Sequence, residues 1–194
     1  ESIDVLIAPT LSIGQAHHHL GFPGTIALRP STLLAVIADV VHSLYRQGFR
    51  HIYFLNGHGG NVATINTAFQ EIYAQSTFGE ADFSELRLIL RNWYMAESVG
   101  KISKELFGNQ EGSHATPSEV SLTFYACPDQ IKSAVMRPAI APNGSIRDAN
   151  DYRAQFPDGR IGSNPALATI EAGERLYKAC VAEVIEDYER FVLS

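Results

Sequence analysis

The stretch HIYFLNGHGGN at residues 51–61 decides how this chain folds. Its first five residues are mostly aromatic, β-branched and apolar, a composition typical of a buried strand. Three glycines then surround a single histidine, and an amphipathic helix follows. A glycine-rich turn between a strand and a helix lies at the carboxyl end of the strand, where open α/β sheets bind their ligands. We therefore expect an α/β fold whose functional loop is residues 56–61.

The rest of the chain alternates strand-like and helix-like segments, which predicts a mostly parallel sheet covered by helices. Apolar runs predict further strands at residues 4–8, 25–28 and 86–93. Caps and apolar spacing predict four helices. The first begins at Ser31, with Ser31 or Thr32 as its cap, and ends at Gly48. The others follow residue 61, begin at about Pro117 with Thr116 as the cap, and span residues 165–191.

Residues 129–162 lack periodicity and predict surface connections. With 194 residues and no recognisable linker, the chain is expected to form a single domain over residues 1–194.

Composition excludes several classes of function. Charged residues make up 19% of the chain, and its formal net charge is -6 without a basic patch, which argues against nucleic-acid binding. No apolar run approaches the length of a membrane span, and no signal peptide is visible. Cys127 and Cys180 lie in apolar stretches without metal-site spacing, so we interpret them as buried free thiols, with a disulfide left open. These features favour a cytoplasmic protein.

His58 is the strongest candidate for chemistry. The glycines around it leave the imidazole accessible at a strand end, where it can bind a metal or move a proton. Backbone N–H groups at the start of the following helix can hold an oxyanion, and Gly59 and Gly60 leave room beside Asn56 for a small substrate. The alternatives are an ordinary strand-to-helix turn and a phosphate-binding turn, although the latter has neither a dinucleotide fingerprint nor a lysine.

A second candidate is the segment EGSHATPSE at residues 111–119, which pairs a loop histidine with a nearby carboxylate. His114 lies in the loop, and Glu119 falls in the first turn of the predicted helix. A carboxylate at that position can act in catalysis or simply cap the helix. Glu111 is a weaker candidate, and we expect it to be solvated.

Two further features can contribute to a binding site. Residues 17–19 are three consecutive histidines, which cannot all point into one site; one or two, with His18 as the candidate, can face a metal or a substrate. Trp93, the only tryptophan, ends a predicted strand. It is expected either to pack in the core or to form a stacking wall for a flat substrate.

The motifs GFPGT at residues 21–25, NGHGGN at 56–61 and the segment from His114 to Ser121 occur in an order that resembles the creatininase family. The sequence ATIEAGER at residues 168–175 resembles the family's closing helix. The resemblance covers nearly the whole chain. It implies a three-layer α/β/α domain, two divalent metal ions (Zn, Mn or Fe) and a homohexamer.

Residue by residue, the resemblance implies that His58 is a metal ligand, that Glu119 is a second ligand with a catalytic role, and that His114 transfers protons. It places Trp93 near a tryptophan that contacts the substrate in creatininase. The family's first motif, a Glu-x-His-Gly stretch followed by Thr-Asp, supplies several metal ligands, is absent here and would precede Glu1; without it, this chain alone is not expected to build the full two-metal site. Creatininase has a glutamate where Gly60 stands here, which argues against creatinine as the substrate.

The resemblance therefore implies a metal-dependent amidohydrolase that cleaves a non-peptide C–N amide bond, cyclic or linear, in a small molecule. A metal ion lowers the pKa of water enough to supply hydroxide at neutral pH, and His114 is expected to protonate the leaving nitrogen. The alternative is a catalytically inactive or truncated family member that serves as a structural or binding subunit.

Overall fold

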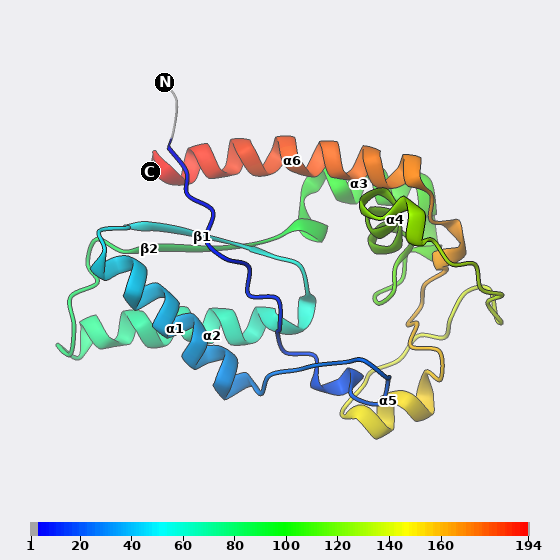
Figure 1. Cartoon of the computed structure of the whole chain (residues 1–194), viewed down its shortest axis with the longest axis horizontal. Coiled ribbons are helices and arrows are strands. Elements are labelled where there is room, and N and C mark those ends of the chain that lie inside the picture. Colours follow the sequence, from blue (N-terminus) through cyan, green and yellow to red (C-terminus); the bar gives the residue numbers. More distant parts are fainter. Residues whose placement is uncertain (1–3, 194) are drawn as a thin grey trace. The chain divides into compact units, whose positions relative to one another are not determined.

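The computed structural model describes residues 4–193 and has an α/β fold (Figure 1). Its strands are β1 (His51–Asn56) and β2 (Arg87–Asn92), and its helices are α1 (Pro30–Arg46), α2 (Val62–Thr77), α3 (Glu97–Phe107), α4 (Pro117–Ala126), α5 (Ala149–Gln155) and α6 (Ile170–Val192). Short 3₁₀ turns include η1 (His17–His19), η2 (Gly59–Asn61) and η3 (Trp93–Met95).

The chain packs as two compact units. Unit 1 contains residues 4–17, 26–93 and 186–193, and unit 2 contains residues 18–25 and 94–185. Each unit has its own buried residues, so each is described separately. The single-domain organisation expected from the length stays a prediction.

Unit 1 is built in three layers around a parallel sheet, as the sequence predicts (Figure 1). In the described residues the sheet consists of β1 and β2, with Asn56 paired to Asn92 at its carboxyl edge. Alternate side chains of the two strands, Ile52, Phe54, Leu88 and Leu90, face the core formed with α1 and α2. The opposite face carries Tyr53 and Arg91, which bind the last turns of α6.

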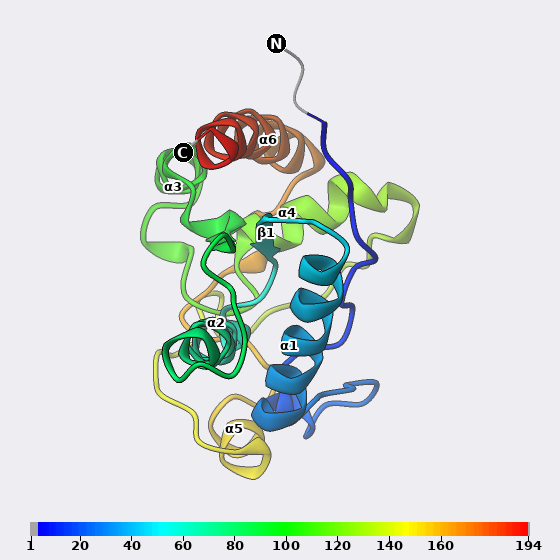
Figure 2. The ribbon, with the colours of Figure 1, turned by 90° about the vertical axis from the view of Figure 1, so that its left-hand side faces the viewer.

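The core of unit 1 lies between the sheet and the crossed helices α1 and α2 (Figure 2). The apolar spacing that predicts these helices also supplies the buried side chains: Leu33, Ile37, Val41, Ile65, Ala68, Phe69, Ile72, Phe83 and Leu86. Their burial removes apolar surface of both helices from water, which stabilises the packing of the helices on the sheet.

Helix α1 begins one residue earlier than predicted. Pro30 occupies its first position and Arg29 precedes it without a side-chain cap, so the prediction that Ser31 or Thr32 caps the helix is wrong. The fixed φ of proline suits the first helical position, where its missing N–H is not needed. Gly48 follows the helix with a φ of 99°, the left-handed conformation predicted for it.

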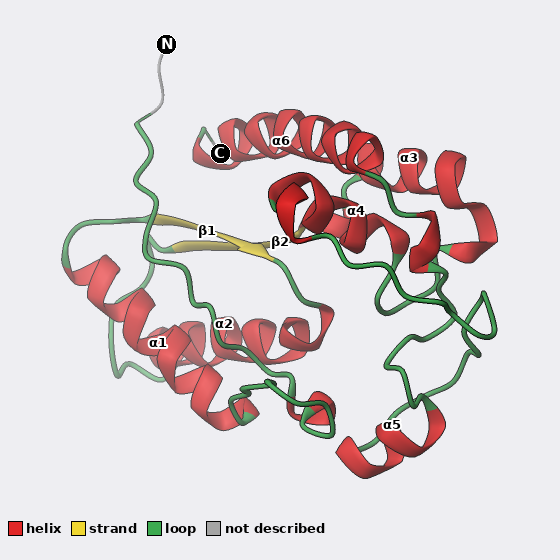
Figure 3. Ribbon diagram, turned by 45° about the vertical axis from the view of Figure 1, so that its right-hand side comes forward, coloured by secondary structure: helices red, strands yellow, loops and turns green. Residues whose placement is uncertain are grey.

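Unit 2 contains α3, α4, α5 and most of α6 (Figure 3). Helix α3 was not predicted from the sequence, and it is held against α6 by specific contacts. The backbone N–H groups of Glu97 and Ser98 each donate to the Glu183 carboxylate at 2.8 Å. The carboxylate thereby satisfies two of the N–H groups that a helix start leaves open. Helix α5 lies within the predicted connection at residues 129–162 and begins at an Asp148 cap.

Two predicted strands are not formed in the described part of the chain. Residues 4–8 have no regular structure, and Leu6 and Ile7 are 78% and 91% exposed. Residues 25–28 are also irregular, and the N–H of Leu28 donates to the carbonyl of Gly14 at 2.9 Å. An apolar run forms a strand only where a neighbouring strand satisfies its backbone, and neither run pairs with one here.

The cysteine prediction is correct in part. Within residues 4–193 the two cysteines form no disulfide, but Cys127 is exposed rather than buried, and Cys180 is half-buried. Among the helices of residues 4–193, none has the length and apolar character needed to cross a membrane.

Candidate functional site

The loop after β1 is held by a single buried amide. Asn56 is 5% exposed, and its Nδ2 donates to the carbonyl of His58 at 2.7 Å and to Oδ1 of Asn92 at 2.8 Å. Its Oδ1 accepts from the N–H of His58 at 3.2 Å and from Nδ2 of Asn61 at 3.1 Å. These bonds commit both amide atoms of Asn56 to holding the loop. The predicted contact between Asn56 and a substrate stays a prediction.

His58 is oriented by the segment that contains Gln15. Its Nε2 lies 3.2 Å from the carbonyl oxygen of Gln15. A carbonyl oxygen only accepts, so this bond requires the hydrogen of the neutral ring on Nε2 and the lone pair on Nδ1. Gln15 is in turn fixed by its N–H, which donates to Oδ1 of Asn61 at 2.8 Å, and by a short hydrogen bond from Thr64. The His58 ring therefore has a defined orientation and tautomer.

Gly60 stands directly against this ring. A Cβ atom at position 60 would lie 2.5 Å from Nε2 of His58 and 2.7 Å from the carbonyl oxygen of Gln15. Real Cβ contacts are longer than this, so the orientation of His58 depends on glycine at position 60. The two predicted substrate-contact glycines, Gly59 and Gly60, both lie in η2.

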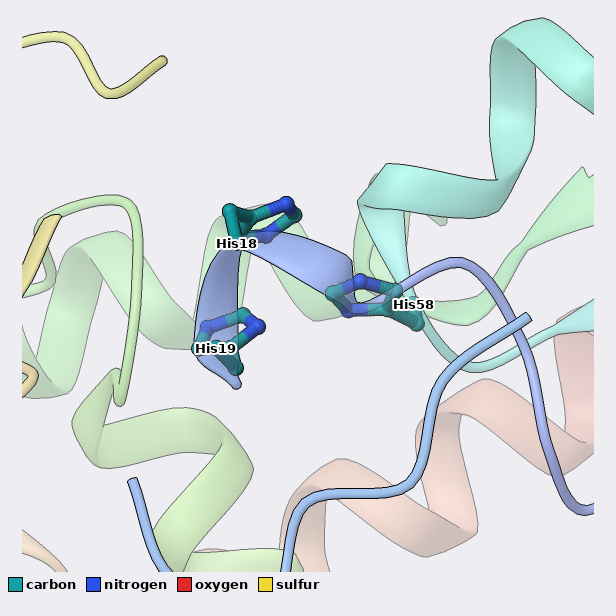
Figure 4. Close-up of side chains that lie close together, drawn as sticks. All are labelled: His18, His19 and His58. Atoms are coloured by element: carbon teal, nitrogen blue, oxygen red, sulfur yellow. The ribbon is translucent and has the colours of Figure 1, made fainter. Parts of the chain in front are cut away.

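A second group of imidazoles lies in unit 2. His18 and His19 each offer a ring nitrogen, these nitrogens lie within 4.8 Å of each other, and their ring centroids are 4.3 Å apart. Figure 4 shows both rings on η1 and draws the His58 ring on its own loop. Nε2 of His19 lies 3.0 Å from Nε2 of His114, so one of these two rings donates to the other. His114, predicted from the sequence, is therefore joined by His19, to which the sequence analysis gave no separate role.

Tyr152 supports these rings from α5. Its ring centroid lies 5.0 Å from His19, 6.0 Å from His114 and 5.4 Å from Phe22 of the GFPGT motif. The side chain is fully buried, and its hydroxyl donates to the carbonyl of Gly159 at 2.5 Å. Burial, followed by the nearby carboxylates of Asp158 and Glu119, raises the pKa of Tyr152 to about 12. Tyr152 is thus a neutral aromatic support.

The backbone of His114 is fixed by an antiparallel bridge to Ile161. The hydroxyl of Ser163 donates to the carbonyl of His114 at 2.6 Å. The next residue, Ala115, has a φ of 52°, a left-handed conformation that few non-glycine residues adopt. These contacts hold the histidine loop in one conformation before α4 begins.

Glu119 caps the helix in which it lies. Thr116 and Glu119 form a capping box: Thr116 Oγ1 accepts from the N–H of Glu119 at 3.1 Å, and Glu119 Oε2 accepts from the N–H of Thr116 at 3.1 Å. The capping role considered from the sequence is therefore present, and the role of Glu119 as a ligand or in catalysis stays a prediction.

Glu111 differs from its prediction. It is half-buried rather than solvated, and this burial raises the pKa of its carboxyl above the ordinary glutamate value, against opposing hydrogen bonds from Ser118 and Thr116. Among the described residues its buried Oε2 has no hydrogen-bond partner, while Oε1 makes a short contact with the hydroxyl of Ser118. Trp93 directly follows β2, begins η3 and is half-buried, and both of its predicted roles stay predictions.

Residues 1–188 match the model of the family described as creatininase, creatinine amidohydrolase. The chain belongs to the creatininase family. Creatinine amidohydrolase of Pseudomonas putida is 27% identical over 202 residues, which cover 96% of this chain and 75% of that protein. The mycofactocin precursor peptide peptidase of Mycolicibacterium smegmatis is 35% identical over 181 residues, covering 92% of this chain and 64% of the peptidase.

Solved creatininase structures share the fold of this family member. A structure described as creatininase Mn has a TM-score of 0.71 at 22% identity and covers 88% of this chain and 68% of its own. A mutant creatininase of the Zn-Zn type has a TM-score of 0.73 at 21% identity, and the match covers 92% of this chain and 72% of the creatininase chain. The α/β fold predicted from the sequence is confirmed.

Three residues of the site were not singled out from the sequence: Gln15, His19 and Tyr152. Gln15 acts through its backbone carbonyl, which carries no sequence signal. His19 was hidden in a run of three histidines, and Tyr152 lies in a segment without periodicity. Only the fold shows that these three residues adjoin predicted ones.

Proposed function

We propose that this chain provides the catalytic residues of a metal-dependent amidohydrolase that cleaves a non-peptide C–N amide bond, linear or cyclic, in a small molecule. The observation that carries the proposal is the orientation of His58. Its Nε2 faces the carbonyl of Gln15, so Nδ1 can bind a cation while that bond is kept. This is the arrangement in which a histidine serves as a metal ligand.

The chemistry of the proposed ligands suits a divalent metal. His58 and Glu119 are the proposed ligands, and His18 and His19 are further imidazoles with ligand nitrogens. Imidazole and carboxylate groups bind Zn, Mn and Fe, and creatininases of the Mn and Zn-Zn types are among the structures that share the fold. We propose that each site holds two metal ions, and that the metal is Zn, Mn or Fe. When bound, such an ion acts as a Lewis acid and lowers the pKa of water.

The chain's own residues have distinct roles in this proposal. His114 protonates the leaving nitrogen, and His19, 3.0 Å away, sets which nitrogen of His114 carries the hydrogen. Glu119 contributes negative charge at the start of α4, where its carboxylate already accepts the backbone N–H of Thr116. Trp93, His18, Asn56, Gly59 and Gly60 are proposed to surround the substrate.

The class of amide is the least constrained part of the proposal. Relatives include a creatinine amidohydrolase and, at 35% identity, a peptidase that processes a peptide precursor. Gly60 in place of the glutamate expected in creatininase disfavours creatinine, and a Cβ at this position would already crowd His58. We propose a small amide substrate, a cytoplasmic location and a homo-oligomer, with a hexamer as the expected assembly.

The test compares metal content and hydrolysis in the natural full-length protein and two variants. His58→Ala should lose bound metal and activity toward a panel of linear amides, cyclic amides and short peptides. Metal added at 100 times its Kd should stabilise the wild-type protein by about 2.7 kcal/mol and should not stabilise the variant. The control is His51→Asn, because His51 lies at the other end of β1, packed against Phe191.

The outcomes separate the alternatives. Wild-type metal content and activity in His58→Ala would refute the role of His58. A wild-type protein that binds no metal and cleaves no member of the panel would favour the inactive, structural subunit. Cleavage confined to the peptides would overturn the small-molecule assignment and leave the hydrolase assignment in place.

A further inference from the structure

The carbonyl group that orients His58 belongs to a segment without regular structure. Residues 4–16 form no helix or strand, so no backbone ladder sets the place of Gln15. Ordering such a segment costs conformational entropy, which its contacts with the rest of unit 1 must offset. The Gln15 carbonyl oxygen nevertheless lies 3.2 Å from Nε2 of His58. The contacts that hold Gln15 therefore also determine how the His58 ring is held.

The start of α2 holds Gln15 at two points. The main-chain N–H of Gln15 donates to Oδ1 of Asn61 at 2.8 Å, and the Thr64 hydroxyl donates to the side-chain Oε1 of Gln15 in a short hydrogen bond. Asn61 caps α2 and Thr64 lies in its first turn, a spacing that places both on one face of the helix. Because Gln15 is anchored through its main chain and its side chain, its carbonyl group has little freedom to turn away from His58.

Thr64 differs from the other threonines of α2. Thr67 and Thr77 are exposed, and their hydroxyls donate to carbonyls of their own helix at 2.8 and 3.3 Å. Thr64 is 6% exposed, and its hydroxyl bonds to Gln15 in another segment. Water cannot readily replace a hydrogen bond at so buried a position. The bond from Thr64 is therefore a specific anchor for Gln15.

The same contacts lead back to the loop that carries His58. Nδ2 of Asn61 donates to Oδ1 of Asn56 at 3.1 Å, and this oxygen also accepts the N–H of His58 at 3.2 Å. Gly14 lies directly on the Asn61 amide, since a Cβ at position 14 would lie 2.5 Å from Oδ1 of Asn61. Gln15 is thus joined to the His58 loop through its N–H as well as through its carbonyl. A shift of Gln15 would change both connections.

We propose that Thr64 is a positioning residue for His58 and acts through Gln15. Its hydroxyl fixes the Gln15 side chain, and the Gln15 carbonyl then keeps the hydrogen of the His58 ring on Nε2. Nδ1 is thereby the nitrogen that can bind a cation. The inference deepens the proposed function, from which it takes only the role of His58 as a metal ligand.

Hydrogen exchange of the metal-free, natural full-length protein tests the first step. Thr64→Val keeps the branched shape of the side chain and removes the hydroxyl. The main-chain N–H of Gln15 should then exchange about 10-fold faster than in wild type, because the anchor beside it is lost. The N–H of Phe69, inside α2, should exchange at the wild-type rate. An unchanged rate at Gln15, or equal acceleration at both residues, would contradict the proposal, since the latter is the effect of a weakened helix.

Nitrogen-15 NMR of the His58 ring, again without metal, tests the second step. At about pH 8, where an ordinary imidazole is neutral, the wild-type ring should show a hydrogen on Nε2 that is protected from exchange with water. Thr64→Val should lose this protection, and Thr64→Ser should keep it because it restores a hydroxyl. A wild-type ring with its hydrogen on Nδ1 would overturn the proposal independently of any variant.

Titration with Zn²⁺ tests whether the anchor affects the proposed ligand. Thr64→Val and Gln15→Ala should each weaken binding by about 10-fold, the effect expected when the outer partner of a ligand histidine is loosened. The double variant should bind no more weakly than either single variant, because both changes remove the same contact. Thr67→Val is the matched control on the same helix and should bind as wild type does. Additive losses in the double variant would contradict action through Gln15.

These measurements separate this inference from the proposed function. A wild-type protein that binds no Zn²⁺ would count against His58 as a ligand. Hydrogen exchange and the ring signal are both measured without metal, so they decide the role of Thr64 in either case.

Discussion

At the scale of single residues, the orientation of His58 depends on what is missing at position 60. Gly60 brings the loop backbone close to the imidazole, and the ring is held between that backbone and the carbonyl of Gln15. A residue with a side chain cannot occupy this position without displacing one of its neighbours. The glycine therefore determines which nitrogen of His58 can be offered to a ligand.

This argument predicts the effect of Gly60→Ala. The added Cβ would meet Nε2 of His58 at 2.5 Å, so the ring should turn and its bond to Gln15 should break. We expect metal affinity to fall by about 10- to 100-fold, the usual range for loss of an outer hydrogen bond to a ligand histidine. Metal titration measures this, with Gly57→Ala as the control, because a Cβ at Gly57 meets nothing within 4 Å. Equal affinities in the two variants would contradict the argument.

The candidate site was predictable from the sequence to the extent that its residues stand in local motifs. His58, His114 and Glu119 stand beside glycines, a cap or a proline, and these neighbours make them visible. Glu111 was expected to be solvated, because no local pattern shows that Ser118 buries against it. Burial of a charged group depends on residues that the fold brings together, and a single sequence does not state them.

At the scale of elements, α4 and α6 approach each other through a glycine. A Cβ at Gly173 would overlap the backbone carbonyl of Ser121, and the Ser121 hydroxyl also accepts the N–H of Thr169 at 3.2 Å. Backbone against backbone leaves no flexible side chain that could move aside. The helix that carries Glu119 is thereby fixed at its middle as well as at its cap.

Gly173→Ala should therefore destabilise the protein although alanine favours helices. Overpacking of this kind costs about 1–3 kcal/mol, and the rigid carbonyl places this site at the upper end. Gly100→Ala is the matched control in α3: its Cβ meets nothing within 4 Å, so it should stabilise the protein by about 0.5–1 kcal/mol. Denaturant unfolding of both variants measures the two effects. A Gly173→Ala variant as stable as wild type would show that the helices separate easily.

The elements that the sequence predicts are those with long periodic faces. Helices α1 and α2, the strands β1 and β2, and the capped start of α4 all appear where they were expected. Helix α3 was missed although Val99, Ile102 and Phe107 have helical spacing, because Gly100 and several polar residues interrupt the face. The run at residues 4–8 was wrongly predicted as a strand, since strand formation depends on a partner and not on apolar character alone.

At the scale of the whole molecule, one carboxylate joins the sheet to its outer helix. Asp187 on α6 accepts from the Tyr53 hydroxyl at 2.9 Å and from Arg91 Nε at 2.7 Å, so it contacts both strands. Burial raises the pKa of Asp187, but the hydrogen bonds from Arg91 and Tyr53 outweigh it, and the net pKa is below the ordinary aspartate value. The folded state thus favours the ionised form.

The lowered pKa sets the sign of a pH effect. A group whose folded pKa is depressed stabilises the protein fully above its unfolded pKa and loses this contribution as pH falls through the folded value. Asp187→Asn should cost about 1 kcal/mol at pH 7, a modest figure because Arg91 is partly exposed, and the difference from wild type should vanish in acid. The measurement is urea unfolding from pH 7 down to acid pH, below the folded pKa of Asp187. Asp129→Asn is the control, because Asp129 is exposed. A difference that does not change with pH would assign the effect to packing.

The Asn56–Asn92 pair also bears on how such a molecule can diversify. The two amides meet at the last paired position of β1 and β2, so the loop with His58 and the turn with Trp93 leave the sheet from one anchored line. Residues inserted or deleted beyond that line would change the walls around a substrate without shifting the strands. Changes in loop length at this edge can therefore remodel the candidate site of this chain while the two asparagines keep the strands in register.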